Sequence, residues 1–271
     1  MDSSVVEGSA ARVQKSMLPV AIYVVSAFLI SALLLGVQSV SGLDPAALTL
    51  PQFGPAVAAA CTLLMFGALR ARLSNHATAV APRRVGADLI MMLVGCTLMG
   101  AVVLAGLWWD GTRLLGPQAV GSVPFVVFLV LQLVGAAGEE IGWRGFMQPV
   151  LETRFGRLAA VLMTGFVWAL WHVQAFAQGA VVAVSFLVSV LGFAVVLGYS
   201  TNGSVPQRIL VATIGHWIIN VGLYVAVGDD THSSPQIIYT AVGAVVAAAV
   251  VLTLQTLARK GRPVPAPRAA R

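Results

Sequence analysis

Two adjacent glutamates, Glu139 and Glu140, follow directly on the apolar run 123–138. The other eight of the ten acidic residues lie in the terminal segments or at the borders of apolar runs: Asp2, Glu7, Asp44, Asp88, Asp110, Glu152, Asp229 and Asp230. An ionised carboxylate within hydrocarbon costs about 3 kcal/mol or more unless it is paired or hydrated, so such a residue marks a candidate functional site. A carboxylate held in such a place could act as a general base.

Further polar side chains lie inside later apolar runs. His172 falls in the fifth run, and His216 and Asn220 fall in the seventh, four residues apart and therefore on one helix face. Arg144 follows Glu140 at the same spacing. Because lipid does not tolerate such groups facing outward, we expect them to converge on an interior, hydrated cavity among the fourth, fifth and seventh spans, with its mouth on the cytoplasmic side.

Each of these residues taken alone has a structural explanation. An imidazole within a membrane helix commonly bonds a neighbouring helix, and Asn220 could hold helices together in the same way. Glu140 and Arg144 could form an ion pair at a helix end. The occurrence of two carboxylates, two imidazoles and an amide together on three spans favours a catalytic site. The spacing alone leaves open which glutamate would be the base.

The elements that must position these groups follow from the composition. The chain has 271 residues, of which 58% are hydrophobic and 10% charged, whereas a soluble domain has about 25% charged residues. A helix needs about 20 mostly apolar residues to span a bilayer. Suitable runs occur at 17–37, 53–69, 88–109, 123–140, 158–178, 180–199, 208–228 and 237–257. The sequence therefore predicts an all-α, polytopic integral membrane protein, with eight transmembrane helices within residues 17–258 that enclose an intramembrane polar cavity.

The net charge of +6 is explained by membrane topology, and we expect no nucleic-acid partner. Fifteen of the sixteen Lys and Arg residues fall in the two terminal segments and in alternate loops, and Arg113 alone falls in the other loops. Cytoplasmic loops carry such an excess. We therefore expect a multi-pass protein of the cell membrane with both termini in the cytoplasm. Residues 1–16 would form an N-terminal tail, and residues 259–271, rich in Pro and Arg, a disordered C-terminal tail.

Three short motifs within residues 139–220 resemble those of a known family. The segment EEIGWR at 139–144 resembles the E-E-x-x-x-R motif of the CAAX protease and bacteriocin-processing (CPBP, or Abi) family of glutamic intramembrane proteases. His172 is similar to the histidine of its F-x-x-x-H motif, with Trp168 at the usual Phe position, and His216 with Asn220 resembles H-x-x-x-N. The motifs occur in the family's order, and eight spans agree with its type II CAAX prenyl endopeptidase branch.

This resemblance implies a glutamate-type intramembrane endopeptidase, similar to a CAAX prenyl protease, that hydrolyses a peptide bond in a membrane-associated protein or peptide within the lipid bilayer. It implies that Glu139 and His172 activate water, that His216 and Asn220 stabilise the oxyanion, and that no metal or cofactor takes part. Supporting roles fall to Glu140, Arg144 and Trp168.

Three other functions stay open at this point. A zinc-dependent membrane hydrolase (a metalloendopeptidase) could use Glu139, His172 and His216 as ligands, because carboxylate and imidazole suit zinc, although no H-E-x-x-H segment occurs. A proton-coupled transporter could use the same cluster as a relay, although no internal repeat is visible. A non-catalytic scaffold of the same family would keep the fold and recruit partners.

Overall fold

The computed structural model describes residues 17–228, 230 and 234–260, with side chains up to residue 258. Throughout this part of the chain the regular structure is helical and no β-strand forms. The all-α fold class is therefore confirmed. Residues 1–16 and 261–271, which hold the two predicted tails, lie outside the described residues, whereas Arg259 and Lys260 still belong to the last helix.

The elements follow one another along the chain and keep these names below. They are α2 (Leu18–Ser41), η1 (Leu50–Phe53), α3 (Gly54–Met65), α4 (Ala68–His76), α5 (Pro82–Trp109), α6 (Phe125–Gly142), η2 (Trp143–Met147), α7 (Gln148–Glu152), α8 (Arg157–Trp171), α9 (Val173–Phe176), α10 (Ala180–Tyr199), α11 (Val205–Val227) and α12 (Gln236–Lys260).

Six helices within the described residues are long and apolar enough to cross a membrane, which makes the chain a multi-pass membrane protein. The predicted count of eight is not confirmed. The second apolar run falls on η1, α3 and α4. The helical segments Leu50–Met65 and Ala68–His76 meet at an angle of 115°, so they give a seventh span only if the two are counted as one bent span. The fifth run forms α8, which has 15 residues and ends before His172.

The helix ends follow from local sequence. Proline occupies the first turn of α2, α5 and α11, where its missing N–H has no partner to lose. Ser204 and Gln207 form a capping box at the start of α11, in which the Ser204 N–H donates to the Gln207 side-chain oxygen at 3.0 Å. Gly42 ends α2 with a φ of 71°, a conformation that a side chain disfavours.

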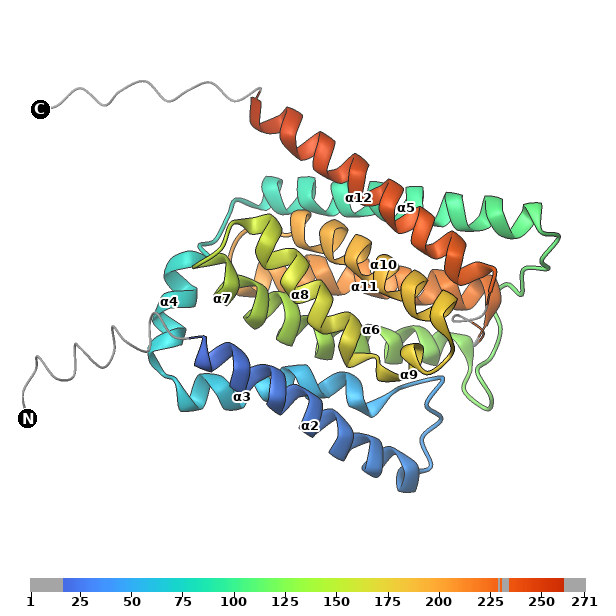
Figure 1. Cartoon of the computed structure of the whole chain (residues 1–271), viewed down its shortest axis with the longest axis horizontal. Helices are drawn as coiled ribbons and strands as arrows, with labels where there is room; N and C mark the ends of the chain where they lie inside the picture. The colour runs from blue at the N-terminus through green and yellow to red at the C-terminus, as the bar shows by residue number, and fades with distance from the viewer. Residues whose placement is uncertain (1–16, 229, 231–233, 261–271) are drawn as a thin grey trace, which may run out of the picture.

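Helices α6, α8, α10 and α11 lie in the middle of the molecule, with α2 and α3 along one side and α5 and α12 along the other (Figure 1). Small residues let the outer helices approach closely. A Cβ atom added to Gly192 of α10 would lie 2.7 Å from the Cβ of Ala244 in α12, and one added to Gly243 of α12 would lie 2.9 Å from the Met99 carbonyl of α5. These contacts bring α12 against both α10 and α5.

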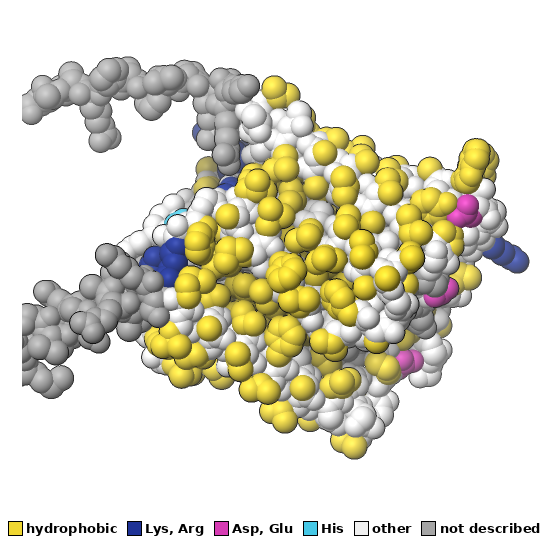
Figure 2. All heavy atoms as spheres, viewed as in Figure 1, with side chains coloured by type: hydrophobic (Ala, Val, Ile, Leu, Met, Phe, Trp, Pro, Cys, Tyr) yellow, Lys and Arg dark blue, Asp and Glu magenta, His cyan; other side chains and the backbone are white. Residues whose placement is uncertain are grey.

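The surface separates into an apolar band and two charged ends. Large apolar side chains stand exposed on several helices, among them Leu33 of α2, Leu64 of α3 and Val126 of α6, each more than two-thirds exposed. Figure 2 shows a broad hydrophobic face with Lys and Arg at the end where both termini lie and mostly Asp and Glu at the other. We call these the basic end (α4, the start of α5, the α7–α8 turn and the α10–α11 loop) and the acidic end (the α2–η1, α5–α6 and α11–α12 loops).

Candidate functional site

The residues predicted to form the site come from three helices that meet in the middle of the bundle. Glu139 and Glu140 lie in the last turn of α6, immediately before η2, a turn of π-helix that continues the chain into α7. His172 follows the last residue of α8, and His216 and Asn220 lie one turn apart on α11. Single π-helical turns occur mostly at functional sites.

Glu139 is 2% exposed and accepts two hydrogen bonds from uncharged donors. The Trp168 indole Nε1–H donates to its Oε2 at 2.7 Å, and the Gln52 side-chain amide donates to its Oε1 at 3.0 Å. Trp168 therefore contributes more than an aromatic surface at the position where the family has Phe. The two bonds fix the orientation of the carboxylate and leave each oxygen free to accept a further bond.

Glu140 points to different partners, although it is the next residue in the chain. Its Oε1 accepts a bond from Arg144 Nη1 and one from His216 Nδ1, each at 2.8 Å. All three side chains are buried, and the Arg144 guanidinium carbon lies 4.4 Å from the Trp168 ring centre. Because an ionised carboxylate only accepts hydrogen bonds, the His216 ring carries its proton on Nδ1 and presents Nε2 at its other edge.

His172 is held by the backbone at the end of α8. Its Nδ1 lies 2.9 Å from the Trp168 carbonyl oxygen, which can only accept, so Nδ1 carries the proton here as well. The ring packs edge-on against Trp171 and tilts against Phe186 of α10, with ring centres 4.8 Å and 5.1 Å apart. The backbone leaves the helical conformation at His172 (φ −84°, ψ 59°), which turns this side chain toward the bundle.

A cavity of about 250 Å³ lies among α6, α8, α10 and α11. Trp168, His172, His216 and Asn220 line it, together with apolar side chains. The two glutamates are not among the described residues that line the cavity: Glu139 lies one hydrogen bond behind Trp168, and Glu140 one behind His216. The two imidazoles and the amide thus meet at one cavity, as predicted, whereas the two carboxylates and Arg144 lie behind its wall.

The cavity lies toward the end of the bundle opposite to the one at which we expected its mouth. We expected it at the basic end, which the charge bias assigns to the cytoplasm. The lining residues Ala46, Gly228 and Ile237 instead belong to the α2–η1 and α11–α12 connections and the first turn of α12, all at the acidic end. Apolar runs and charge bias locate the helices and the cytoplasmic end, but they do not show which end of a bundle is filled by side chains.

Among the described residues, no group of three His, Cys, Asp or Glu side chains is arranged to hold a metal ion. Glu139, His172 and His216, the ligand set considered for zinc, therefore do not form a ready-made site. Both oxygens of Glu139 already accept bonds from Trp168 and Gln52, and His216 Nδ1 is bound to Glu140.

Two glutamines belong to the site although the motifs do not contain them. Gln52 of η1 supports Glu139 across a separation of 87 residues, and Gly135 and Gly138 of α6 leave the room it needs. Gln132 lines the cavity, and its side-chain oxygen accepts a bond of 3.4 Å from Asn220 Nδ2. Gln132 stands seven residues before Glu139, a spacing that places both on one helix face and could have revealed it. The segment around Gln52 carries no such signal.

The family model described as type II CAAX prenyl endopeptidase Rce1-like matches residues 121–222, which include all three motifs. The chain is also 31% identical over 143 residues to a CAAX prenyl protease 2 of Methanococcus maripaludis, an alignment that covers 48% of this chain and 51% of the relative. The match thus spans about half the length of that relative. The match over residues 121–222 and the likeness to this relative confirm the resemblance to the type II CAAX prenyl endopeptidase family that the three motifs indicated.

Proposed function

We propose that the chain is a membrane endopeptidase that hydrolyses a peptide bond at the cavity among α6, α8, α10 and α11. The observation that carries this proposal is that two imidazoles and an amide line one cavity, while Glu139 lies behind Trp168 and Glu140 lies behind His216. The family match and the relative's printed name support the same activity. In this proposal the substrate is a membrane-associated protein or peptide, and no metal or cofactor takes part.

Water activation is assigned to Glu139 and His172. His172 has its Nδ1 proton committed to the Trp168 carbonyl, so Nε2 can accept a proton from a water bound in the cavity. Glu139 is held by two uncharged donors, and each of its oxygens has a lone pair left for a further bond, but Trp168 stands between it and the cavity, so the water must pass this ring to reach it. The two groups together would deprotonate the water as it attacks the peptide carbonyl and return the proton to the leaving amine.

Oxyanion stabilisation is assigned to His216 and Asn220, which follow one another along the cavity wall. To donate from Nε2, the His216 ring must carry a second proton, and the Glu140 carboxylate at 2.8 Å stabilises that positive charge. Glu140 would therefore set the charge of the oxyanion donor, and Arg144 would hold Glu140 in place. A donor of this kind contributes about 3–4 kcal/mol to the transition state in a water-poor site.

The test compares membrane and secreted peptides from cells that carry the native chain with those from cells that carry the Glu139→Gln form. Glutamine keeps the shape of glutamate and removes the charge, so the variant should fold and insert but produce none of the new peptide termini. Asp110→Asn, the same removal of a charge at an exposed carboxylate outside the cavity, serves as the control and should keep the termini. Identical sets of termini from native and Glu139→Gln cells would contradict proteolysis and favour a scaffold.

A further inference from the structure

The cavity occupies only the half of the bundle that is nearer the acidic end. On α11 its lining runs from His216 to Gly228, just past the end of the helix. His216 itself lies 11 residues after Val205, where α11 starts at the basic end, which corresponds to about 17 Å of helix. On α6 the lining residues Phe128 and Gln132 belong to the first half of the helix, again toward the acidic end.

Packed side chains fill the bundle between the cavity and the basic end. Every residue from 142 to 151 is buried, and Trp143, Phe146 and Met147 are among the most completely enclosed side chains of the described chain. Tyr23 of α2 packs against Trp143 and Phe146, with ring centres 5.8 Å and 4.9 Å apart. This layer leaves no continuation of the cavity toward the basic end.

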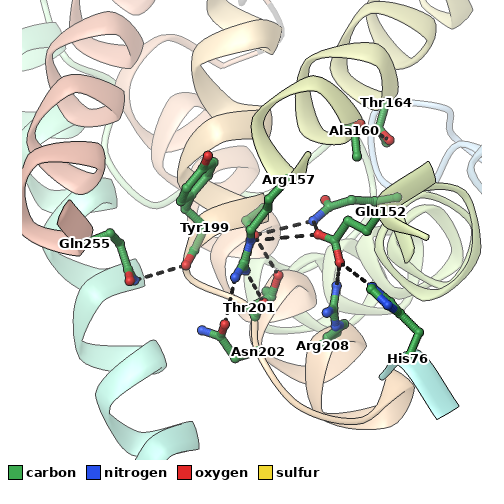
Figure 3. Close-up of polar contacts among 12 residues, drawn as sticks. His76, Glu152, Arg157, Ala160, Thr164, Tyr199, Thr201, Asn202, Arg208 and Gln255 are labelled. Atoms are coloured by element: carbon green, nitrogen blue, oxygen red, sulfur yellow. Dashed lines mark hydrogen bonds and ion pairs between the residues drawn. The ribbon is translucent and has the colours of Figure 1, made fainter. Parts of the chain in front are cut away.

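A network of ion pairs closes the basic end below that layer (Figure 3). Glu152 is its centre: Arg208 Nη1 donates to its Oε2 at 2.7 Å, His76 Nε2 lies 3.2 Å from the same oxygen, and Gln148 Nε2 donates to its Oε1 at 2.8 Å. The Glu152 and Arg208 side chains are 6% and 9% exposed. The network therefore joins α4, α7 and α11 through charges that are largely withdrawn from water.

Arg157 extends the same closure to α10. Its guanidinium donates to the Asn202 side-chain oxygen at 2.8 Å and to the carbonyls of Gly198 and Thr201 at 2.7 Å and 2.6 Å. Figure 3 shows Arg157 between Glu152 and the loop that contains Asn202. A peptide that entered from the basic end would have to break several hydrogen bonds to charged groups, each of which contributes about 1.5–3 kcal/mol.

From these observations we propose that the substrate enters the cavity from the acidic end, and that its scissile segment lies at the extracytoplasmic face of the membrane. The charge bias assigns this face, because the end that carries Arg72, Arg83 and Arg84 belongs in the cytoplasm while the acidic end carries Asp44 and Asp110. The substrate class would be an exported peptide or the outer segment of a membrane protein. This inference rests on the proposed endopeptidase function and deepens it.

The lining indicates which side chains would flank the scissile bond. Phe128, Phe186 and Phe193 line it together with Trp168, and within the described lining the two imidazoles are the titratable groups besides the Tyr224 phenol. The volume of about 250 Å³ lies slightly below that of a pocket for a drug-sized ligand, so it suits one or two apolar side chains rather than a folded segment. The peptide would thus carry apolar residues at the bond that is cut.

Accessibility of single cysteines tests the direction of entry without any need for cleavage. The native Cys61 and Cys96 are first replaced by Ser and Ala. Ser189→Cys then places a thiol in the cavity wall, on a residue whose hydroxyl bonds only its own helix, at the Ser185 carbonyl. Arg113→Cys and Arg83→Cys form the matched control pair, because both are exposed and they stand at the acidic and basic ends. Intact cells are treated with a charged, membrane-impermeant maleimide and then permeabilised and labelled with a neutral maleimide.

External treatment should remove most of the later labelling of Ser189→Cys and Arg113→Cys and leave that of Arg83→Cys unchanged. The proposed entry would be wrong if the charged maleimide blocked Ser189→Cys only under conditions in which it also blocks Arg83→Cys. It would also be wrong if neither maleimide modified the Ser189→Cys thiol. External labelling of Arg83→Cys would overturn the assignment of the extracytoplasmic face. None of these labelling outcomes contradicts the endopeptidase function. If external labelling of Ser189→Cys is observed but the chain cleaves no peptide, the endopeptidase function is refuted and the direction of entry is not.

Discussion

Glu139→Gln and Glu140→Gln are the same chemical change at adjacent residues, and the structure predicts that they differ in their effect on stability. In Glu140→Gln, the buried Arg144 guanidinium loses its only anionic partner at 2.8 Å among the described residues, and its Nε and Nη2 have no other bond there to compensate. Removal of one member of a buried pair costs about 3–5 kcal/mol. Glu140→Gln should therefore lower the free energy of unfolding by about that amount.

Glu139→Gln should cost much less, because the partners of Glu139 are uncharged. The new amide group faces either the Trp168 indole or the Gln52 side chain, and Gln52 can rotate its own amide to present oxygen instead. The expected loss is therefore about 1 kcal/mol, the net contribution of a single hydrogen bond.

A double-mutant cycle isolates the charge effect. Arg144→Met keeps apolar volume against the Trp168 ring, and the double variant Glu140→Gln with Arg144→Met removes both charges of this pair, so neither is left buried without its partner. It should be more stable than the sum of the single losses predicts, with a coupling of about 2 kcal/mol or more. Unfolding of the purified chain in mixed micelles with rising dodecyl sulfate, followed by Trp fluorescence, gives all four free energies. Additive losses, or equal losses for the two Glu→Gln variants, would refute this account of the pair.

Other expectations concern turnover, support and metal. Asn220→Ala should lower kcat by about 100- to 1000-fold with little change in KM, as measured with a fluorogenic peptide cut by the native chain, because the amide is assigned to the oxyanion. Gln52→Ala should lower kcat less than Asn220→Ala while Gln52→Glu, which places a second carboxylate beside Glu139, should abolish turnover. Dialysis against a metal chelator should leave the cleavage rate unchanged, and restoration of a lost rate by zinc would favour the metal-dependent alternative. Glu152→Ala should lower the unfolding free energy by about 3 kcal/mol, because it leaves the Arg208 charge without its partner at 2.7 Å.

Hydropathy predicted the positions of the helices more accurately than the number of helices that cross the membrane. Each of the eight apolar runs coincides with helix in the described chain, because burial of the backbone in lipid demands it. Hydropathy counts residues and contains no direction, however, so the bend of 115° within the second run and the break at His172 in the fifth are invisible to it. At this break the His172 ring turns away from the helix face that it would otherwise continue, and it points into the bundle.

The motifs predicted which side chains meet but could not assign their partners. Adjacent residues on a helix point about 100° apart, so Glu139 and Glu140 must face different neighbours, and only the packing of α8 and α11 decides which. The structure pairs Glu139 with Trp168 and Glu140 with His216. Gln52 was missed because its role depends on a contact between segments far apart in the chain, which no local pattern contains.

The π-helical turn Trp143–Met147 has a consequence for how this chain can change. One extra residue in the turn rotates everything after it by about 100°, so that Glu140 faces His216 while Glu152, farther along the same span, faces Arg208. Deletion of one residue in this turn would rotate Glu152 away from Arg208, although no side chain of the Glu140–His216 or Glu152–Arg208 pair had been replaced. A substitution within 125–152 acts at its own position, whereas a change in the length of this segment would put two separate polar assemblies out of phase.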